Sequence, residues 1–209
     1  RVSPALTEYT FDPDERTATV NATNGDAANV DFAATLNLYA ISGTVTEGEG
    51  GFGGVLMTLE YVLGPTRVGP RQVPGVTTQP DGSYSFTGLP AGQYRVTPSL
   101  NEYTFAPADR TLTVNEANGD VQDADFAATL NTYSISGQVY TLTSVGRQGV
   151  ANATVTVEAV GGAVSVSQLP SPVTTTSTGN YVFSGLPAGQ YRVTAAHTEA
   201  DIEHPELTS

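Results

Sequence analysis

Aspartates beside two repeated turns are the side chains of this 209-residue sequence best suited to binding a cation. Asp26 ends an Asn-Gly-Asp turn and Asp31 follows it, and Asp120 and Asp125 repeat this arrangement 94 residues later. Calcium takes six to eight oxygen ligands from such groups, so the four aspartates are weak candidates for calcium sites. The spacing does not fit an EF-hand loop, and Asn-Gly and Gly-Asp are ordinary turn dipeptides. Turns without a bound metal are therefore the interpretation we favour.

The two histidines of the chain, His197 and His204, lie in a C-terminal tail together with four carboxylates. Imidazole and carboxylate groups suit zinc and its neighbours, but a solvated acidic tail explains the same composition. The chain has no cysteine, and its repeated part carries no histidine that could act as a catalytic base. We therefore predict a protein that is not an enzyme and that requires no cofactor.

Ten tyrosines offer the kind of aromatic surface on which sugars stack. However, Tyr39, Tyr84, Tyr94 and Tyr181 fall at alternating positions that face the core of a β-sheet protein. There is also no tryptophan. We favour core packing for these rings, and a carbohydrate-binding accessory module of a secreted enzyme is the alternative.

Composition excludes several classes of partner. The net charge is −13 and every basic residue is arginine, so we expect no nucleic acid partner, because phosphate binding depends on basic residues. No apolar run approaches the roughly 18 residues that cross a bilayer, so we expect no membrane insertion by this segment. The first residue is Arg1 rather than Met, which indicates a processed product or an excised piece.

One stretch, residues 81–98, organises the elements that carry these side chains. Tyr84 and Phe86 alternate with small polar residues, as in a strand with one buried face. A turn rich in Gly and Pro follows, with Leu89 placed to plug the end of the core, and the alternation then resumes. This pattern predicts a β-hairpin, and it returns almost unchanged at residues 178–194.

The chain repeats itself with a period near 94 residues. Residues 1–11 match residues 95–105, and residues 31–37 match residues 125–131 with the same offset. The second copy of the hairpin stretch follows the first after 97 residues, because one loop is longer. Such a period exceeds that of solenoid repeats and has the size of an independent domain.

Each period holds about seven short strands separated by turn residues, which predicts an all-β protein built of antiparallel β-sandwiches. We expect a complete unit at 38–131, the closing strands of an incomplete unit at 1–37, and a third unit at 132–209. The third unit lacks closing strands of its own and ends in the acidic tail. The junctions contain no flexible linker, so the tandem domains are expected to stack stiffly end to end.

The motifs at residues 41–45, 54–59 and 77–96 resemble those of carboxypeptidase regulatory-like domains. That family is related to the collagen-adhesin B-type repeats of bacterial surface proteins, and both share a transthyretin-like (prealbumin-like) β-sandwich. The resemblance covers nearly the whole chain, although Thr178 replaces Asp81 in the third unit. It implies tandem, non-catalytic spacers of extracellular or cell-surface proteins and no particular ligand. The Lys–Asn crosslink of many B-type repeats is impossible here, because the chain has no lysine.

We therefore expect a non-catalytic structural subunit of an extracellular or cell-surface rod, stalk or fibre that serves attachment, as in adhesion or biofilm. A carbohydrate-binding accessory module of a secreted enzyme is the first alternative. A regulatory module for a peptidase is the second.

The register of the repeats suggests how such a subunit assembles. The strands that the third unit lacks are predicted near the N-terminus of the chain, at residues 9–11, 16–20 and 30–35. An unpaired sheet edge invites a strand from another chain. We predict head-to-tail polymerisation by β-strand complementation, in which a second copy donates a segment that buries Tyr9, Phe11, Val20 and Phe32. The partner is then the protein itself, and neighbouring repeats of a longer chain are the alternative.

Overall fold

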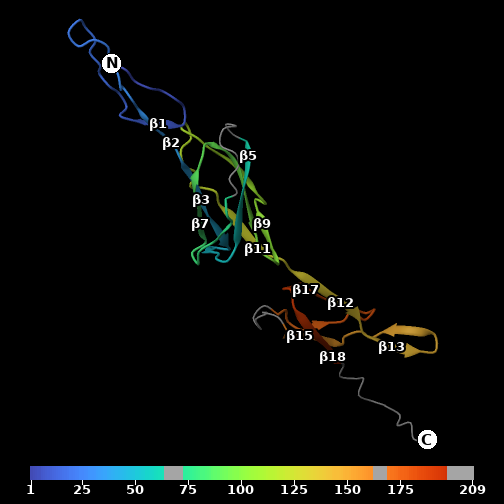
Figure 1. Ribbon diagram of the computed structural model, residues 1–209. Helices are drawn as coiled ribbons and strands as arrows, with labels where there is room; N and C mark the ends of the chain where they lie inside the picture. The colour runs from blue at the N-terminus through green and yellow to red at the C-terminus, as the bar shows by residue number, and fades with distance from the viewer. Residues whose placement is uncertain (64–72, 162–168, 197–209) are drawn as a thin grey trace. The chain divides into compact units, whose positions relative to one another are not determined.

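The computed structural model describes residues 1–63, 73–161 and 169–196 (Figure 1). Every helix or strand in these ranges is a β-strand, so the predicted all-β fold class is confirmed. Within the same ranges, no helix has the length and apolar character that a bilayer crossing requires. The chain divides into two compact units, Arg1–Thr129 and Leu130–Ser209, which we describe separately. The finer division at residues 37 and 131 stays a prediction.

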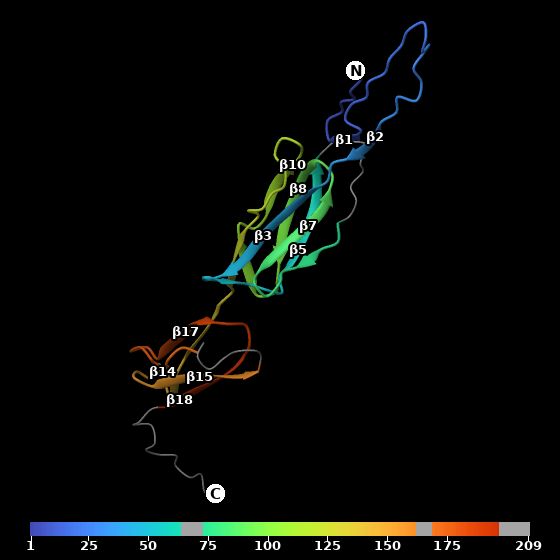
Figure 2. The same cartoon turned by 90° about the vertical axis from the view of Figure 1, so that its left-hand side faces the viewer.

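The first unit contains a complete β-sandwich. Its strands are β3 (Tyr39–Glu47), β4 (Gly50–Gly51), β5 (Leu56–Leu63), β6 (Val76–Thr77), β7 (Ser83–Leu89), β8 (Gly92–Ser99), β9 (Tyr103–Ala106), β10 (Arg110–Val114) and β11 (Phe126–Leu130). One sheet has the strand order β10-β8-β5-β6, and Figure 2 shows its central strands. The other has the order β4-β3-β11-β9, with β7 paired to β3.

Alternating side chains from both sheets fill the space between them. Along β8, every second residue is buried and the residues between are more exposed, as expected for a strand with one face in a core. The largest fully buried side chains of this unit are those of Phe86, Ile41, Met57, Leu89, Val45, Val55, Val96 and Val114. Residues from β10 and β11 belong to this core, so the closing strands are part of its packing.

One strand pairing departs from the expected antiparallel pattern. β11 runs parallel to β3, with Phe126 opposite Val45. The connection that precedes β11 already follows β3, because the Ser42 N–H donates to the carbonyl of Val121 at 2.8 Å. β3 is therefore held on one side by β7 and on the other by the closing segment.

The predicted β-hairpin at residues 81–98 is wrong. β7 pairs with β3 in one sheet, while β8 pairs with β5 and β10 in the other. The turn between them is a corner that joins the two sheets. Leu89 is buried inside this corner, and the Tyr94 hydroxyl donates to the carbonyl of Pro90 at 2.9 Å across it. Alternation alone predicts a buried face for each strand but does not say which strand is its partner.

The N-terminal segment of the first unit contains two short strands outside the sandwich. β1 (Tyr9–Asp12) and β2 (Ala33–Leu36) pair antiparallel to each other. Residues 16–20, which we predicted as a strand, form no strand, although Arg16 makes an isolated bridge to Val2. Their counterpart β10 is a strand because it lies along β8. In the described part of the chain, residues 17–20 have no such neighbouring strand.

The second unit is an open version of the same sandwich. Its strands are β12 (Tyr133–Gln138), β13 (Tyr140–Thr143), β14 (Gly146–Gly149), β15 (Thr154–Gly161), β16 (Val173–Thr174), β17 (Asn180–Leu186) and β18 (Gln190–Ala196). β12 pairs with β17, β13 with β14, and β15 lies between β16 and β18. Its buried core cluster is small and consists of Val155, Val157, Phe183 and Leu186. Among its described residues, no strand takes the places of β9, β10 and β11.

Candidate functional site: a self-assembly interface

Val20 differs sharply in exposure from the equivalent residue of the complete sandwich. Val114, which lies 94 residues later in the same Thr-Val motif, is 0% exposed at the end of β10. The Val20 side chain is 66% exposed. Because the sequence around the two valines is nearly the same, the difference comes from the sandwich that covers Val114. Val20 therefore lies in the sequence context of a buried core residue, but no sandwich covers its side chain.

The loop that carries Val20 already makes some of the hydrogen bonds of its folded counterpart. Arg16 Nε donates to the carbonyl of Asp31 at 2.8 Å, as Arg110 Nε does to the carbonyl of Asp125 at 2.9 Å. The Asn21 side chain accepts hydrogen bonds from the next turn, and its counterpart Asn115 does the same. These hydrogen bonds preorganise part of the N-terminal segment, although residues 16–20 are not in the strand conformation of their counterpart β10.

The other predicted donor residues lie on the same segment. Tyr9 and Phe11 are on β1 and are half-buried, and Phe32 is also half-buried just before β2. The counterpart of Phe32 is Phe126, which is buried in the core of the complete sandwich. The structure therefore brings Tyr9, Phe11 and Phe32 together around the β1–β2 pair, and it places Val20 on the loop outside that pair.

The second unit has an open side where the closing strands of the complete unit lie. Within the described residues, the outer edge of β12 has no partner strand, and neither does the outer edge of β18. Core positions next to these edges are less buried than their counterparts. Ile135 and Val193 are half-buried, although both of their counterparts, Ile41 and Val96, are fully buried.

Tyr181 lies in the space that the closing segment occupies in the complete unit. There, the backbone of Ala124 lies so close to Gly43 that a Cβ at this glycine would overlap the Ala124 carbonyl. A Cβ at the equivalent Gly137 would instead meet the ring and hydroxyl of Tyr181. The counterpart of Tyr181 is buried and donates its hydroxyl to the Ala124 carbonyl. The tyrosine of the open unit therefore covers the glycine that a closing strand covers in the complete one.

The aspartates proposed for calcium have different surroundings in the two copies. All four aspartates are exposed, but Asp120 and Asp125 accept hydrogen bonds from the backbone of β3, and within the described residues Asp26 and Asp31 have no equivalent contact. The described residues contain no group of three or more His, Cys, Asp or Glu side chains placed to hold a metal. Calcium binding stays a prediction. His197 and His204, which we considered as zinc ligands or as part of a solvated tail, lie outside the described residues.

The tyrosines that we assigned to the core are found there. Tyr84 and Tyr94 are buried, and Tyr39 packs against the same cluster. Tyr181 packs against the core of the second unit. Burial also raises the pKa of both Tyr84 and Tyr94, as expected for phenols held in an apolar environment. Since the rings of Tyr84 and Tyr94 are buried, they offer no platform on which a sugar could stack.

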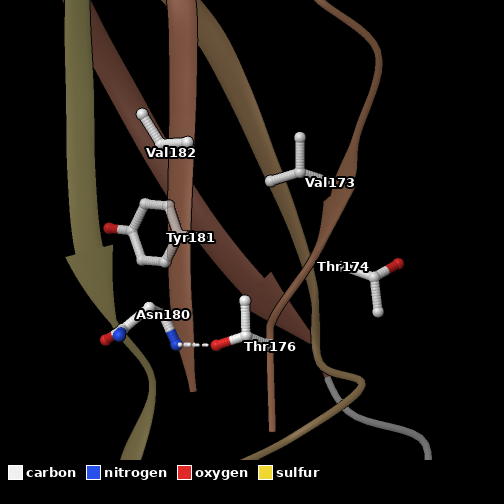
Figure 3. Close-up of a pocket in the computed structure, with 6 residues that line it drawn as sticks. All are labelled: Val173, Thr174, Thr176, Asn180, Tyr181 and Val182. Atoms are coloured by element: carbon white, nitrogen blue, oxygen red, sulfur yellow. Dashed lines mark hydrogen bonds between the residues drawn. The ribbon is translucent and has the colours of Figure 1, made fainter. Parts of the chain in front are cut away.

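A hollow with a volume of about 380 Å³ lies beside β17 (Figure 3). Figure 3 shows the Asn180 N–H donating to Thr176 Oγ1, at 3.1 Å, along one side of it. A hollow of the same volume occurs at the equivalent residues of the complete unit. The lining residues of the first are Val173, Thr174, Thr176, Asn180, Tyr181 and Val182. Because both units contain this hollow and neither lines it with charged groups, we assign it no separate function.

Comparison with known families agrees with the motifs of the hairpin stretch. Residues 134–206 match the family model of the carboxypeptidase regulatory-like domain. The resemblance to carboxypeptidase regulatory-like domains is confirmed. Residues 38–128 match the model of the second β-sandwich domain of the NOMO1-like subunit of the BOS complex. The regulatory-like domain therefore corresponds to the open unit, and the complete unit matches a β-sandwich model. No curated protein sequence matches the chain.

Several solved structures align with the chain at low identity. The Bacillus anthracis TIE protein aligns with a TM-score of 0.52 and 14% identity, over 79% of this chain and 31% of that one. A streptococcal ancillary pilin aligns at 0.41 and 17%, over 77% and 54%. GBS52, the minor pilin of Streptococcus agalactiae, aligns at 0.34 and 15%, over 78% and 84%. The chain spans about a third of the first of these proteins and about half of the second.

Sequence reasoning missed two features of this region. Glu8 joins the N-terminal segment to the complete unit by accepting hydrogen bonds from the Tyr39 hydroxyl at 2.6 Å and the Glu116 N–H at 3.1 Å. An acidic residue repeated at positions 8 and 102 was the available signal. The second missed feature is the placement of Tyr181 over Gly137. It depends on the absence of a closing strand from the described residues of the open unit, and no sequence motif indicates that absence.

Proposed function

We propose that the protein is a non-catalytic structural subunit of an extracellular or cell-surface filament, and that its copies join head to tail by β-strand complementation. One copy supplies the N-terminal segment, residues 9–36, and the next supplies the open side of its second unit. The observation that carries this proposal is the contrast between exposed Val20 and buried Val114. The extracellular location rests on the regulatory-like domain, whose family consists of spacers of secreted and surface proteins.

The two surfaces have the same origin in the repeat, which supports their complementarity. The N-terminal segment matches the closing strands of the complete unit, and the second unit matches its opening strands. Combining them restores every strand of one sandwich. Because the two surfaces are different, the contact is heterologous and leaves a free surface of each kind at the two ends. Such a contact propagates into a filament.

The free energy available from the junction is large enough for stable association. Full burial of a Val or Phe side chain stabilises a structure by about 1.5 to 3 kcal/mol. Val20 and Phe32 would gain burial in the junction, as their counterparts Val114 and Phe126 show, and backbone hydrogen bonds along β12 and β18 would add to this. The N-terminal segment is already ordered by its own hydrogen bonds, so less conformational entropy is lost on binding.

Substituting Val20 tests the proposal. We expect Val20→Asp to abolish assembly, because the junction would bury a carboxylate without a partner. The same change leaves the stability of the separate subunit within about 0.5 kcal/mol, because the Val20 side chain is mostly exposed there. Sedimentation velocity and electron microscopy measure assembly, and thermal unfolding measures the stability of the subunit.

Thr19→Asp is the matched control, because Thr19 is the neighbouring residue and its side chain points away from the core in the counterpart strand. The control variant should assemble like the wild type. A wild-type chain that stays monomeric at all concentrations would contradict the proposal, and it would favour an occupant from neighbouring repeats of a longer chain. Specific, saturable binding to a polysaccharide would instead favour the carbohydrate-binding alternative.

A further inference from the structure

The complete unit contains a template for the junction. Asp120 Oδ1 accepts a hydrogen bond from the Ala40 N–H at 2.8 Å, and Asp125 Oδ1 accepts one from the Thr44 N–H at 2.7 Å. Between these two contacts, the Ser42 N–H donates to the carbonyl of Val121 at 2.8 Å. The outer edge of β3 is thus held by two carboxylates with backbone hydrogen bonds between them.

The same groups are present in the open unit and the N-terminal segment, but they are apart. Asp26 and Asp31 precede Asp120 and Asp125 by 94 residues, and within the described residues their carboxylates make no hydrogen bond. Ser134 and Gln138 follow Ala40 and Thr44 by 94 residues. Because donors alternate between the two edges of a strand, their N–H groups face the open edge of β12.

We propose that Asp26 and Asp31 set the register of the junction by accepting hydrogen bonds from the backbone N–H groups of Ser134 and Gln138 in a second copy of the chain. This inference rests on the proposed function and assigns its binding residues. In this register the Ser136 N–H donates to the carbonyl of Ala27, as Ser42 does to Val121. The aspartates then bind backbone N–H groups of protein, in place of the calcium ion that the sequence suggested.

Charge favours this partner over others. Residues 1–37 carry six carboxylates and two arginines, so the segment is strongly acidic. Residues 130–196 carry two arginines and a single carboxylate, Glu158. Residues 130–196, which contain the strands of the open side, therefore have a net charge of +1, and the four carboxylates of the tail lie outside them. Complementary charges of this kind speed association and select the partner.

The junction also requires Arg16 to exchange one backbone partner. Arg16 and Val2 form two backbone hydrogen bonds, at 2.8 and 2.9 Å, within one copy. Val2 and Val193 are both equivalent to Val96 in the repeat. In the complete unit, Val96 lies opposite Arg110. In the junction Val193 of the second copy therefore replaces Val2. The number of hydrogen bonds is conserved, so the exchange has a low cost.

The first test removes the two carboxylates from the full-length chain. We expect the double variant Asp26→Ala, Asp31→Ala to raise the critical concentration for assembly about tenfold or more. Each of the two substitutions removes a charged acceptor and so one hydrogen bond of the junction. Asp14→Ala is the matched control, since the complete unit already carries alanine at the equivalent Ala108. Thermal unfolding of the double variant should equal that of the wild type. An unchanged critical concentration would overturn the proposal.

The second test reads the register directly, because the chain has no cysteine of its own. Thr113 lies opposite Gln93 in the template, so Thr19 should lie opposite Gln190 of the second copy. We expect the double variant Thr19→Cys, Gln190→Cys to form disulfide-linked ladders on oxidation, whereas Ala18→Cys with Gln190→Cys should not. Filaments without the expected crosslink would overturn the register alone. A wild-type chain that forms no filaments would overturn the proposed function as well.

Discussion

At the scale of single residues, the best-defined contact of the N-terminal segment is the one between Tyr39 and Glu8. The hydroxyl of Tyr39 donates to the carboxylate of Glu8 at 2.6 Å. Burial, and then the hydrogen bond to Glu8 and its negative charge, raise the pKa of Tyr39 from 10.0 to about 12. The neutral phenol is the form that donates, so the contact contributes fully below pH 10. Its contribution is lost as the pH rises from about 10 through about 12.

We expect Glu8→Gln to lower the pKa of Tyr39 toward its ordinary value, because the negative charge that disfavours tyrosinate is removed. The measurement is an absorbance titration of tyrosinate, taken as the difference between each protein and its Tyr39→Phe variant. Glu49→Gln is the control, since Glu49 is exposed in a turn and lies outside this contact. A pKa of Tyr39 that does not respond to Glu8→Gln would show that burial alone causes the shift.

At the scale of strands, one close backbone approach occurs at a glycine of β3. A Cβ on Gly43 would overlap the backbone of Ala124 on the closing segment, and backbone cannot move aside without breaking the sheet. At Gly137 the same Cβ would meet the side chain of Tyr181, which can rotate away. The two glycines therefore differ in what a methyl group would disturb.

We expect Gly137→Ala to fold normally as a subunit and to fail in assembly, because the added methyl group would collide with the incoming backbone near Val30 of the second copy. Gly43→Ala is the matched variant in the complete unit, and we expect it to destabilise that unit by about 2 kcal/mol or more. Thermal unfolding and sedimentation velocity measure the two effects. Normal assembly of Gly137→Ala would contradict the proposed path of the donated strand.

The strands themselves were accessible from the sequence, because alternation of residues such as Tyr84 and Phe86 reports which face is buried. The pairing of these strands was harder to predict from the sequence. The corner at Leu89 was mistaken for a hairpin, since the same turn residues serve both, and the parallel pairing of β11 with β3 depends on a sheet crossing that no local pattern encodes. The strand predicted at residues 16–20 is missing because a strand requires a neighbour, and the neighbour is not part of the described chain.

The sequence repeat predicted which segments form the candidate interface, but it did not predict the hydrogen bonds of these segments. The repeat shows which strands each unit contains, so Val20 and Phe32 were identified as core residues without a core. The repeat does not show hydrogen bonds, so the sequence indicated only turns, with Asp26 and Asp31 as weak candidates for calcium. Only the contacts of Asp120 and Asp125 with β3 reveal that carboxylates at these places bind backbone N–H groups.

At the scale of the whole molecule, the net negative charge opposes association between copies, and the charge is unevenly distributed along the chain. A net charge of −13 keeps separate copies in solution, while most of the carboxylates lie before residue 130. The described part of the second unit carries a single one. Residues 130–196 are therefore the least acidic part of the chain, although the tail at residues 197–209 carries four carboxylates. In the proposed assembly, this distribution would favour association of the N-terminal segment of one copy with the strands of the open unit of another.

The central claim is that one donor surface and one acceptor surface join different copies, and a mixing experiment tests it most directly. Val20→Asp impairs the donor and leaves the acceptor intact, and Gly137→Ala does the reverse. Sedimentation velocity of each variant alone should show monomers. An equimolar mixture should show a heterodimer and no longer species, because one functional junction remains. Polymers from either variant alone, or a mixture that stays monomeric while the wild type assembles, would contradict the claim.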